Sequence, residues 1–499
     1  MDKLNLRMAG YDYLIEKYQI KVIQQNHISI ISDSNIFRTN NNDGVTEEIF
    51  PNSYWPGTAD FDQLEFTLKY DGINLGIIFS LFEVIDQKEL ISYIKSKPTG
   101  KYARRIWFLF EYLTGITLPL ENLKIGNYIE ILEPDLYYTT EKGERVQRFR
   151  ITNNLLGTKD FCPIVRRSEK LKKAESENLN KKCESVAKSY PPQLLRRALS
   201  YLYSKETKSS FEIENIKPTA SRTEKFVNLL ELAEKQDFCK KQQLIELQNR
   251  IVDQRFIDND YRRSQNYIGQ AVEYQKEIIH YICPKPEDVS ELMNGLLSSH
   301  LRMKENGISA LIHTAVISYG FVFIHPFEDG NGRIHRFLIH NLLSIRGMIP
   351  QGLMFPVSAA ILKNPAEYDR SLESFSRPLL KQIEYSLDNN GKMSINGETG
   401  HFYKYIDMTP QAEALAEFVK LTIEIELVEE LNFLANYDKA RLGIQEIIDM
   451  PDNLIDLFIK LSLQNKGYLS VRKRQTHFVF LTDEELKSME KVIMTVYFK

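Results

Sequence analysis

The order of apolar and polar residues along the chain predicts a mainly helical protein. Residues 60–85 and 87–112 have the periodicity of helices, whereas residues 127–152 resemble strands around a turn at 141–143. The first part of the chain therefore mixes helix and strand. From about residue 190 to residue 378 the helical pattern dominates.

Two features mark the beginnings of helices in this second part. Pro191 and Pro192 precede an apolar stripe that ends at Tyr203, and proline is well tolerated in the first turn of a helix. Ser221 and Glu224 have the spacing of a capping box and precede another apolar run. We expect one helix to begin at each place.

Three regions follow from the pattern as a whole. The highly charged stretch 169–188 predicts a linker or an exposed helix. After residue 391 helices return up to about Gln464, and residues 467–480 are typical of a short hairpin. The predicted regions are a mixed N-terminal region at 1–175, a helical core at 190–380 and a helical, winged-helix-like C-terminal region at 381–499.

Composition adds limits on partners and location. The net charge of −3 over 499 residues gives no global attraction to nucleic acid or to an anionic membrane. The four cysteines form no C-x-x-C pair, so we expect free thiols in a reducing cytoplasm. Residues 1–20 lack an apolar run of signal-peptide type, and the longest apolar stretch, 73–85, is too short to cross a bilayer.

A short loop concentrates residues that carry chemistry. It lies between two apolar helical segments, 308–324 and 334–345. Gly330 and Gly332 flank Asn331, which lets the backbone bring its N–H groups close to a ligand. Because the loop ends at a helix N-terminus, those N–H groups and the helix dipole attract anions.

The charged residues of the loop complete this prediction. Arg333 and Arg336 are three residues apart, on one face of the first helical turn, where both reach the same anion. Asp329 is a hard oxygen ligand suited to Mg²⁺, and His325 is suited to accept a proton near neutral pH. Together they predict a polyphosphate site with a metal and a general base.

The segment from His325 to Arg336 resembles the signature of the Fic family, H-P-F-x-[D/E]-G-N-G-R-x-x-R, at every fixed position. Residues 284–297 resemble the Pro-rich turn and helix of that family. Residues 261–269 resemble its flap hairpin, which holds a target segment by strand pairing. The resemblance implies target docking by Arg262, Gln265, Asn266, Tyr267, Ile268 and Gly269. It implies a mainly α fold: a Fic helical bundle with a small flap hairpin between a mixed α/β N-terminal region and the winged-helix-like end.

The activity that the resemblance implies is protein adenylylation, in which AMP passes from ATP to a Ser, Thr or Tyr hydroxyl. His325 would take the hydroxyl proton, and Asp329 would hold Mg²⁺ or Mn²⁺. The phosphates would be bound by Gly330, Asn331, Gly332, Arg333 and Arg336. Tyr368 either lines the adenine pocket or is a packed helix tyrosine. The partners would be ATP and a target protein, with the chain itself and a second copy of it as further candidates.

A second motif of the family predicts a built-in brake. Many Fic proteins carry [S/T]-x-x-x-E-[G/N] on a helix whose Glu pairs with the last Arg of the signature. Residues 210–215 fit, with Ser210 and Glu214 at the defining positions. Residues 117–122 fit as well, but Pro119 argues against a helix there. We therefore expect autoinhibition by a Glu214–Arg336 ion pair, as in family members with an N-terminal inhibitory helix (class II).

Two other functions stay open. Relatives transfer other phosphate-containing groups or remove AMP from modified proteins, although Gly332, in place of the Lys of phosphate-transferring relatives, favours AMP transfer. The second alternative is a DNA-binding regulator. It rests on the basic triplet 472–474 in the predicted C-terminal hairpin, which could meet DNA phosphates.

Overall fold

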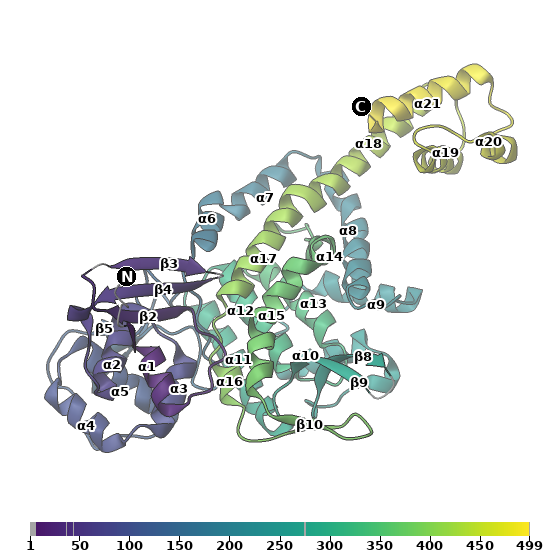
Figure 1. The fold of residues 1–499 in the computed structure, drawn as a ribbon. Coiled ribbons are helices and arrows are strands. Elements are labelled where there is room, and N and C mark those ends of the chain that lie inside the picture. Colours follow the sequence, from purple (N-terminus) through teal and green to yellow (C-terminus); the bar gives the residue numbers. More distant parts are fainter. Residues whose placement is uncertain (1–5, 36, 43, 274–275, 499) are drawn as a thin grey trace.

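The computed structural model describes residues 6–35, 37–42, 44–273 and 276–498 (Figure 1). Helices dominate, so the predicted mainly helical fold with small sheets is confirmed. Buried apolar side chains form an N-terminal, a central and a C-terminal cluster, with a small fourth cluster beside the first strands. Figure 1 shows the N-terminal elements beside the helical bundle and α19–α21 at the far end of α18.

A four-stranded sheet begins the chain, and the hydrophobic pattern did not predict it. Its strand order is β1-β2-β4-β3, with β2 and β4 parallel and the other pairs antiparallel. Only a few of its residues are buried, which explains the weak sequence signal. The elements are β1 (Leu6–Ala9), α1 (Tyr11–Tyr18), β2 (His27–Ser32), β3 (Arg38–Asn42) and β4 (Val45–Pro51).

The remaining N-terminal elements follow the prediction in outline. The expected helix at 60–85 is divided by a π-helical turn, Thr67–Asp71, and by Gly72, whose φ of 85° ends it. The strands expected within 127–152 are present but short. The elements are α2 (Asp60–Phe66), α3 (Leu75–Val84), α4 (Gln87–Ser96), α5 (Lys101–Thr114), β5 (Ile129–Glu130), β6 (Glu144–Val146) and β7 (Ile151–Asn153).

The charged stretch after these strands is helical, which decides between the linker and the exposed helix. It forms α6 (Glu169–Glu177) and α7 (Leu179–Lys188), followed by α8 (Pro192–Glu212). The capping box predicted at Ser221 is wrong. Helix α9 (Ala220–Leu232) begins earlier, because the Thr219 side chain accepts from the backbone N–H of Arg222.

The central bundle surrounds the predicted loop. Helix α12 is buried on nearly all faces and packs along α13. A β-hairpin lies beside them, and α15 packs against its second strand. The elements are α10 (Lys241–Ile251), β8 (Tyr267–Glu273), β9 (Lys276–Ile282), α11 (Pro286–Glu305), α12 (Ala310–Ile324), α13 (Asn331–Ile345), α14 (Val357–Lys363) and α15 (Pro365–Gln382).

The C-terminal part corrects the predicted hairpin at 467–480. Ser470 instead caps helix α20, and Tyr468, Val471 and Val479 are exposed rather than packed on a sheet face. The basic triplet therefore lies on a helix and not on a wing. The elements are β10 (Tyr385–Leu387), β11 (Met393–Ile395), α16 (His401–Lys404), α17 (Thr409–Leu421), α18 (Leu427–Gln445), α19 (Asp452–Gln464), α20 (Val471–His477) and α21 (Asp483–Tyr497).

No helix within the described residues combines the length and the apolar character needed to cross a bilayer. The division of the chain into three regions stays a prediction.

Candidate active site

The predicted loop joins the C-terminus of α12 to the N-terminus of α13. Helix α12 ends at His325, which is left-handed at φ 52° and donates its N–H to the Phe321 carbonyl at 2.9 Å. Gly330, at φ 90°, caps α13. A left-handed histidine is strained, and such strain is typical of functional sites. The structure therefore brings His325 and the first turn of α13 to opposite ends of one tight loop.

Asn331 holds this loop in shape. Its side-chain oxygen accepts from the backbone N–H of Phe327 at 3.0 Å, and its amide donates to the Phe327 carbonyl at 2.7 Å. Phe327 is fully buried, as expected of a core anchor. Because the Asn331 side chain is committed to the loop, a bound phosphate could be contacted by its backbone N–H only.

Arg262 holds the same loop in place through hydrogen bonds to backbone carbonyls. Its guanidinium donates to the carbonyls of His325 at 2.7 Å, Ser264 at 2.7 Å and Pro284 at 2.6 Å. Its side chain is almost completely buried. The structure thus places the Arg262 side chain in the interior at the base of the hairpin, where it holds the His325 backbone. It does not lie on the exposed surface of the hairpin.

His325 has the protonation state that a base needs. Its Nδ1 lies 3.2 Å from the Val322 carbonyl, so Nδ1 carries the proton and Nε2 keeps a free lone pair. Burial lowers the pKa of His325 to about 4, although the Val322 carbonyl opposes this shift. The imidazole is therefore neutral at pH 7.

Asp329 is open to solvent on one side. Its Oδ1 accepts from the Gly330 N–H at 2.6 Å and from Arg333 Nη2 at 2.7 Å. The side chain remains 43% exposed, which leaves Oδ2 accessible. One accessible carboxylate oxygen beside a phosphate site fits Mg²⁺, which takes few protein ligands and completes its shell with water and phosphate.

The two arginines of the loop are buried and converge on one carboxylate. Arg336 Nη2 lies 2.6 Å from Oε1 of Glu214, and Arg333 Nε lies 2.9 Å from its Oε2. The guanidinium groups are 2% and 1% exposed, respectively. Arg336 also donates to the Ser210 hydroxyl at 2.9 Å and to its carbonyl at 2.6 Å. Glu214 thus lies between the two arginines and pairs with both.

The end of α8 places Glu214 there. The N–H of Ile216 donates to the Phe211 carbonyl and the N–H of Asn215 to the Glu212 carbonyl, which is the Schellman pattern. Asn215 sits at the left-handed position, at φ 56°. This conformation favours Gly or Asn, so the last position of the 210–215 motif has a structural reason. Residues 117–122, the competing match, form no helix.

The Glu214 carboxylate leaves no room for a side chain at Gly332, in the first turn of α13. A Cβ added there would lie 2.5 Å from Oε1 of Glu214. The absence of a side chain lets the carboxylate reach both arginines, and it would equally let a phosphate approach the backbone.

The predicted flap is the hairpin of β8 and β9, with a bulge beside Gly269. Ile268 is 43% exposed on it. Gln265 and Asn266 instead bond to backbone groups at the hairpin's base, and the Tyr267 hydroxyl donates to the Gly391 carbonyl at 3.2 Å. Of the residues predicted for the flap, Ile268 is therefore exposed, whereas Gln265, Asn266 and Tyr267 are held by hydrogen bonds to the backbone.

A largely apolar cavity of about 490 Å³ opens between the flap, the end of α12 and α15. It has the size of a small-ligand pocket. Its walls include Ile268, Ile279, Val322, Phe323, Asp369 and Leu372. Tyr368 lies next to these residues in the chain, but it is 7% exposed and stacks on His335 with ring centroids 6.0 Å apart. Both alternatives for Tyr368 stay open.

One residue of this region was missed from the sequence. Glu206 on α8 is fully buried, and its carboxylate accepts from the Ser358 N–H at 2.8 Å and from the Ser358 hydroxyl. Burial raises the pKa of Glu206 to about 7. Glu206, Ser210 and Glu214 are spaced four residues apart, so the helical periodicity could have placed them on one face.

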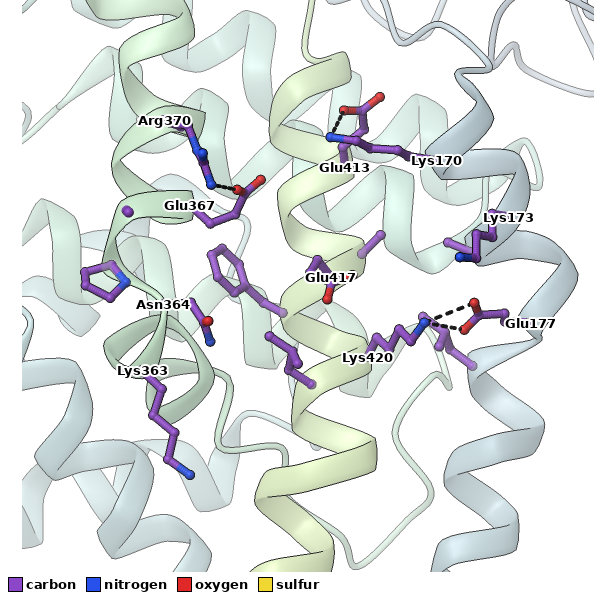
Figure 2. Close-up of a pocket in the computed structure, with 17 residues that line it drawn as sticks. Lys170, Lys173, Glu177, Lys363, Asn364, Glu367, Arg370, Glu413, Glu417 and Lys420 are labelled. Atoms are coloured by element: carbon purple, nitrogen blue, oxygen red, sulfur yellow. Dashed lines mark hydrogen bonds and ion pairs between the residues drawn. The ribbon is translucent and has the colours of Figure 1, made fainter.

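A larger groove lies elsewhere. It measures about 690 Å³ and runs between α6, the start of α15 and α17. Figure 2 shows that its charges mostly pair with one another, as in Lys420–Glu177, Lys170–Glu413 and Arg370–Glu367. None of the loop residues described above lines this groove.

Comparison with known proteins agrees with this geometry. Residues 238–343 match the model of the Fic/DOC family. "Protein adenylyltransferase Fic" of Aedes aegypti is 33% identical over 131 residues, or 25% of this chain. The protein of the same name from Nematostella vectensis is 35% identical over 88 residues, or 17% of this chain. The chain spans about a fifth to a quarter of these curated relatives, at 23% and 20% of their lengths.

Two solved structures are also similar. One is a Fic family protein from Desulfovibrio desulfuricans G20, at 17% identity and a TM-score of 0.36, covering 62% of this chain and 82% of that one. The other is a Fic domain containing signaling protein from Bacteroides thetaiotaomicron, at 16% identity and a TM-score of 0.38, covering 52% and 96%.

The segment that matches the Fic/DOC family model does not contain every residue of the candidate site. It includes His325, Asp329 and both arginines of the loop. Glu214 lies before the segment and Tyr368 after it. The candidate site therefore extends beyond the matched segment to Glu214, which lies just after the end of α8.

Proposed function

We propose that this protein is a protein adenylyltransferase whose activity is restrained by Glu214. The observation that carries the proposal is the pair of buried arginines at the N-terminus of α13, within one loop of a neutral histidine. An anion-binding helix N-terminus beside a base is what nucleotidyl transfer to a hydroxyl requires.

In the proposed reaction, a target hydroxyl oxygen attacks the α-phosphorus of ATP. Its proton passes to Nε2 of His325, and the bond between the α-phosphorus and the bridging oxygen breaks. Pyrophosphate leaves with the electron pair. Arg333 and Arg336 would neutralise the charge that grows on the leaving phosphates. Positioning supplies most of the acceleration, since pyrophosphate is a good leaving group.

Asp329 would hold Mg²⁺ or Mn²⁺ through its accessible oxygen, and the cation would supply positive charge at the phosphates. The base of ATP would enter the cavity beneath the flap, where Val322 and Phe323 provide apolar walls next to His325. The exposed edge of β8 around Ile268 would hold an extended target segment.

Glu214 would compete directly with the nucleotide. A carboxylate that pairs with both arginines leaves neither free for the terminal phosphates. This extends the expected Glu214–Arg336 pair to a second arginine. Displacing Glu214 is the step that would turn the enzyme on.

The test is transfer of label from α-labelled ATP with Mg²⁺ to the chain itself and to a lysate. The wild type, Glu214→Gly and Glu214→Gly/His325→Ala are compared at equal concentration. We expect label with Glu214→Gly at least about tenfold above the wild type, and a loss of about 100- to 10,000-fold on adding His325→Ala.

Nucleotide binding without any label in Glu214→Gly would contradict AMP transfer. A second arm then decides between the alternatives: AMP-modified protein is supplied to the wild type, and other nucleotides to Glu214→Gly.

A further inference from the structure

Three side chains with metal-ligand chemistry meet at a place separate from the loop of His325. They are Asp237 and Cys239, just before α10, and His300 on α11. One donor atom of each lies within 4.8 Å of the other two. His300 is fully buried, Cys239 is 4% exposed and the Asp237 side chain is 16% exposed. The cluster is thus enclosed, with Asp237 at its opening.

The backbone holds Asp237 and Cys239 in a fixed relation. The N–H of Cys239 donates to Oδ1 of Asp237 at 3.0 Å, which leaves Oδ2 directed at His300. Phe238 between them is buried against Phe337, with ring centroids 4.9 Å apart, and its N–H donates to Asn341. Because Phe238 is anchored, the carboxylate and the thiol cannot separate easily.

The distance across the cluster is close to that of a coordinated ion. Oδ2 of Asp237 and Nε2 of His300 are 3.0 Å apart. Two ligands of a tetrahedral zinc ion are separated by about 3.3–3.8 Å, so a small outward movement is sufficient.

His300 also has an outer partner of the kind that metal-bound histidines use. Its Nδ1 lies 3.1 Å from Nε2 of His313, which is itself fully buried on α12. With a metal on Nε2, the Nδ1–H of His300 would donate to His313, whose proton would be on Nδ1. Such a contact fixes the ring orientation of a ligand histidine.

The ammonium group of a lysine already lies beside this cluster. Nζ of Lys304 is 2.7 Å from Oδ2 of Asp237, and the Lys304 side chain is 41% exposed. The long, exposed stem lets the ammonium leave without opening the core. Lys304 therefore acts as an exchangeable countercharge that a metal ion would have to displace.

We propose that Asp237, Cys239 and His300 bind Zn²⁺. A mixture of one thiolate, one imidazole and one carboxylate suits a borderline-soft ion and not Mg²⁺ or Ca²⁺. On binding, Cys239 releases its proton to solvent and Lys304 swings away. The zinc bonds form to Sγ, Nε2 and Oδ2, and water completes the shell.

The proposed site would stiffen the support of α13. Asn341 on α13 donates to the carbonyls of Ala233 at 2.6 Å and Gln236 at 2.8 Å, immediately before the cluster. Zinc would tie this loop to α11 and thereby hold the helix that carries Arg333 and Arg336. This role is independent of the nucleotide chemistry proposed above.

The test measures Zn²⁺ binding to the full chain by competition with a chromophoric chelator, after removal of metal. Cys239→Ser and Asp237→Asn are compared with Cys183→Ser, which removes a buried thiol of α7 far along the chain. We expect both ligand variants to lose at least the roughly 10- to 100-fold that loss of an outer partner costs, and Cys183→Ser to bind as the wild type. Lys304→Ala should bind up to about fivefold tighter, because a competing ion pair is removed.

Co²⁺ gives a second readout that a folding defect would not imitate. The wild type and Cys183→Ser should show a thiolate-to-cobalt charge-transfer band that Cys239→Ser lacks, with all three folded by circular dichroism. The proposal is overturned by the absence of saturable Zn²⁺ binding, or by affinities that Cys239→Ser and Asp237→Asn leave unchanged. Either result would leave a hydrogen-bonded cluster only.

Discussion

The loop between α12 and α13 and the first turns of α13 differ in how far their polar side chains are buried and paired. In the first turns of α13, Arg333 and Arg336 are buried and held by Glu214 and Ser210. In the loop, His325 keeps Nε2 unbonded and Asp329 is 43% exposed. The His325 imidazole is neutral and the Asp329 carboxylate is partly exposed, whereas both arginines of α13 are paired with the Glu214 carboxylate.

For the proposed function, this difference indicates the step at which the activity would be controlled. Buried cations must be paired, so removing Glu214 without replacement leaves Arg336 without a carboxylate partner, while Arg333 keeps its ion pair with Asp329. A bound polyphosphate would replace the missing carboxylate. Under the proposed function, control therefore falls on nucleotide placement, and the proposed reacting groups need no rearrangement.

The largest effect is expected from removing an arginine once Glu214 is gone. In the Glu214→Gly background, Arg336→Ala should weaken ATP binding by about 30- to 1,000-fold, because a buried charge partner is lost. Isothermal titration of ATP measures this. Arg370→Ala, an exposed arginine of α15, serves as the control and should bind ATP as its parent does. Equal affinity in Arg336→Ala would mean that the anion site lies elsewhere.

A smaller, more selective effect is expected in the loop. Asp329→Asn in the same background should bind metal-free ATP within a few-fold of its parent but lose stimulation by Mg²⁺, since it keeps the hydrogen-bond acceptor and loses the charge. Transfer rates across a Mg²⁺ titration measure this. Glu328→Gln, the exposed neighbour, should keep its Mg²⁺ response. A normal Mg²⁺ response in Asp329→Asn would exclude Asp329 as the ligand.

The smallest effect concerns acid. Burial lowers the pKa of His325 to about 4, below the value of about 6.5 in an unfolded chain. Between these values the unfolded chain binds more protons, so the free energy of unfolding falls as pH decreases from 6.5 toward 4, by at most about 1.4 kcal/mol per pH unit for one histidine. Denaturant unfolding at several pH values should show a shallower fall in His325→Gln. An equal slope in His325→Gln and in the wild type would show that His325 is not held neutral.

Several parts of the protein could be predicted because their signals are local. The loop from His325 to Arg336 carries its own glycines, cap and charges, so its helix-loop-helix form follows from neighbouring residues. The periodicity of α8 was equally clear. The N-terminal sheet was not, since few of its residues are buried and the alternation is weak.

The prediction of a C-terminal hairpin at 467–480 was wrong for a related reason. The apolar residues at 467–480 looked like two strands, but Ser470 offered a helix cap that competes locally with a strand. Only the packing of Leu469 and Phe478 into the C-terminal cluster decided for the helix.

The sequence by itself determined the chemistry of the loop and the identity of its groups, because twelve consecutive residues contain them. The tertiary structure alone decided which carboxylate meets the arginines, since 122 residues separate Glu214 from Arg336. It also decided that the buried Arg262 side chain donates to the His325 carbonyl. The same packing brings the side chains of Asp237, Cys239 and His300 close together. Contacts between distant segments depend on how helices pack, and no local pattern of residues records that packing.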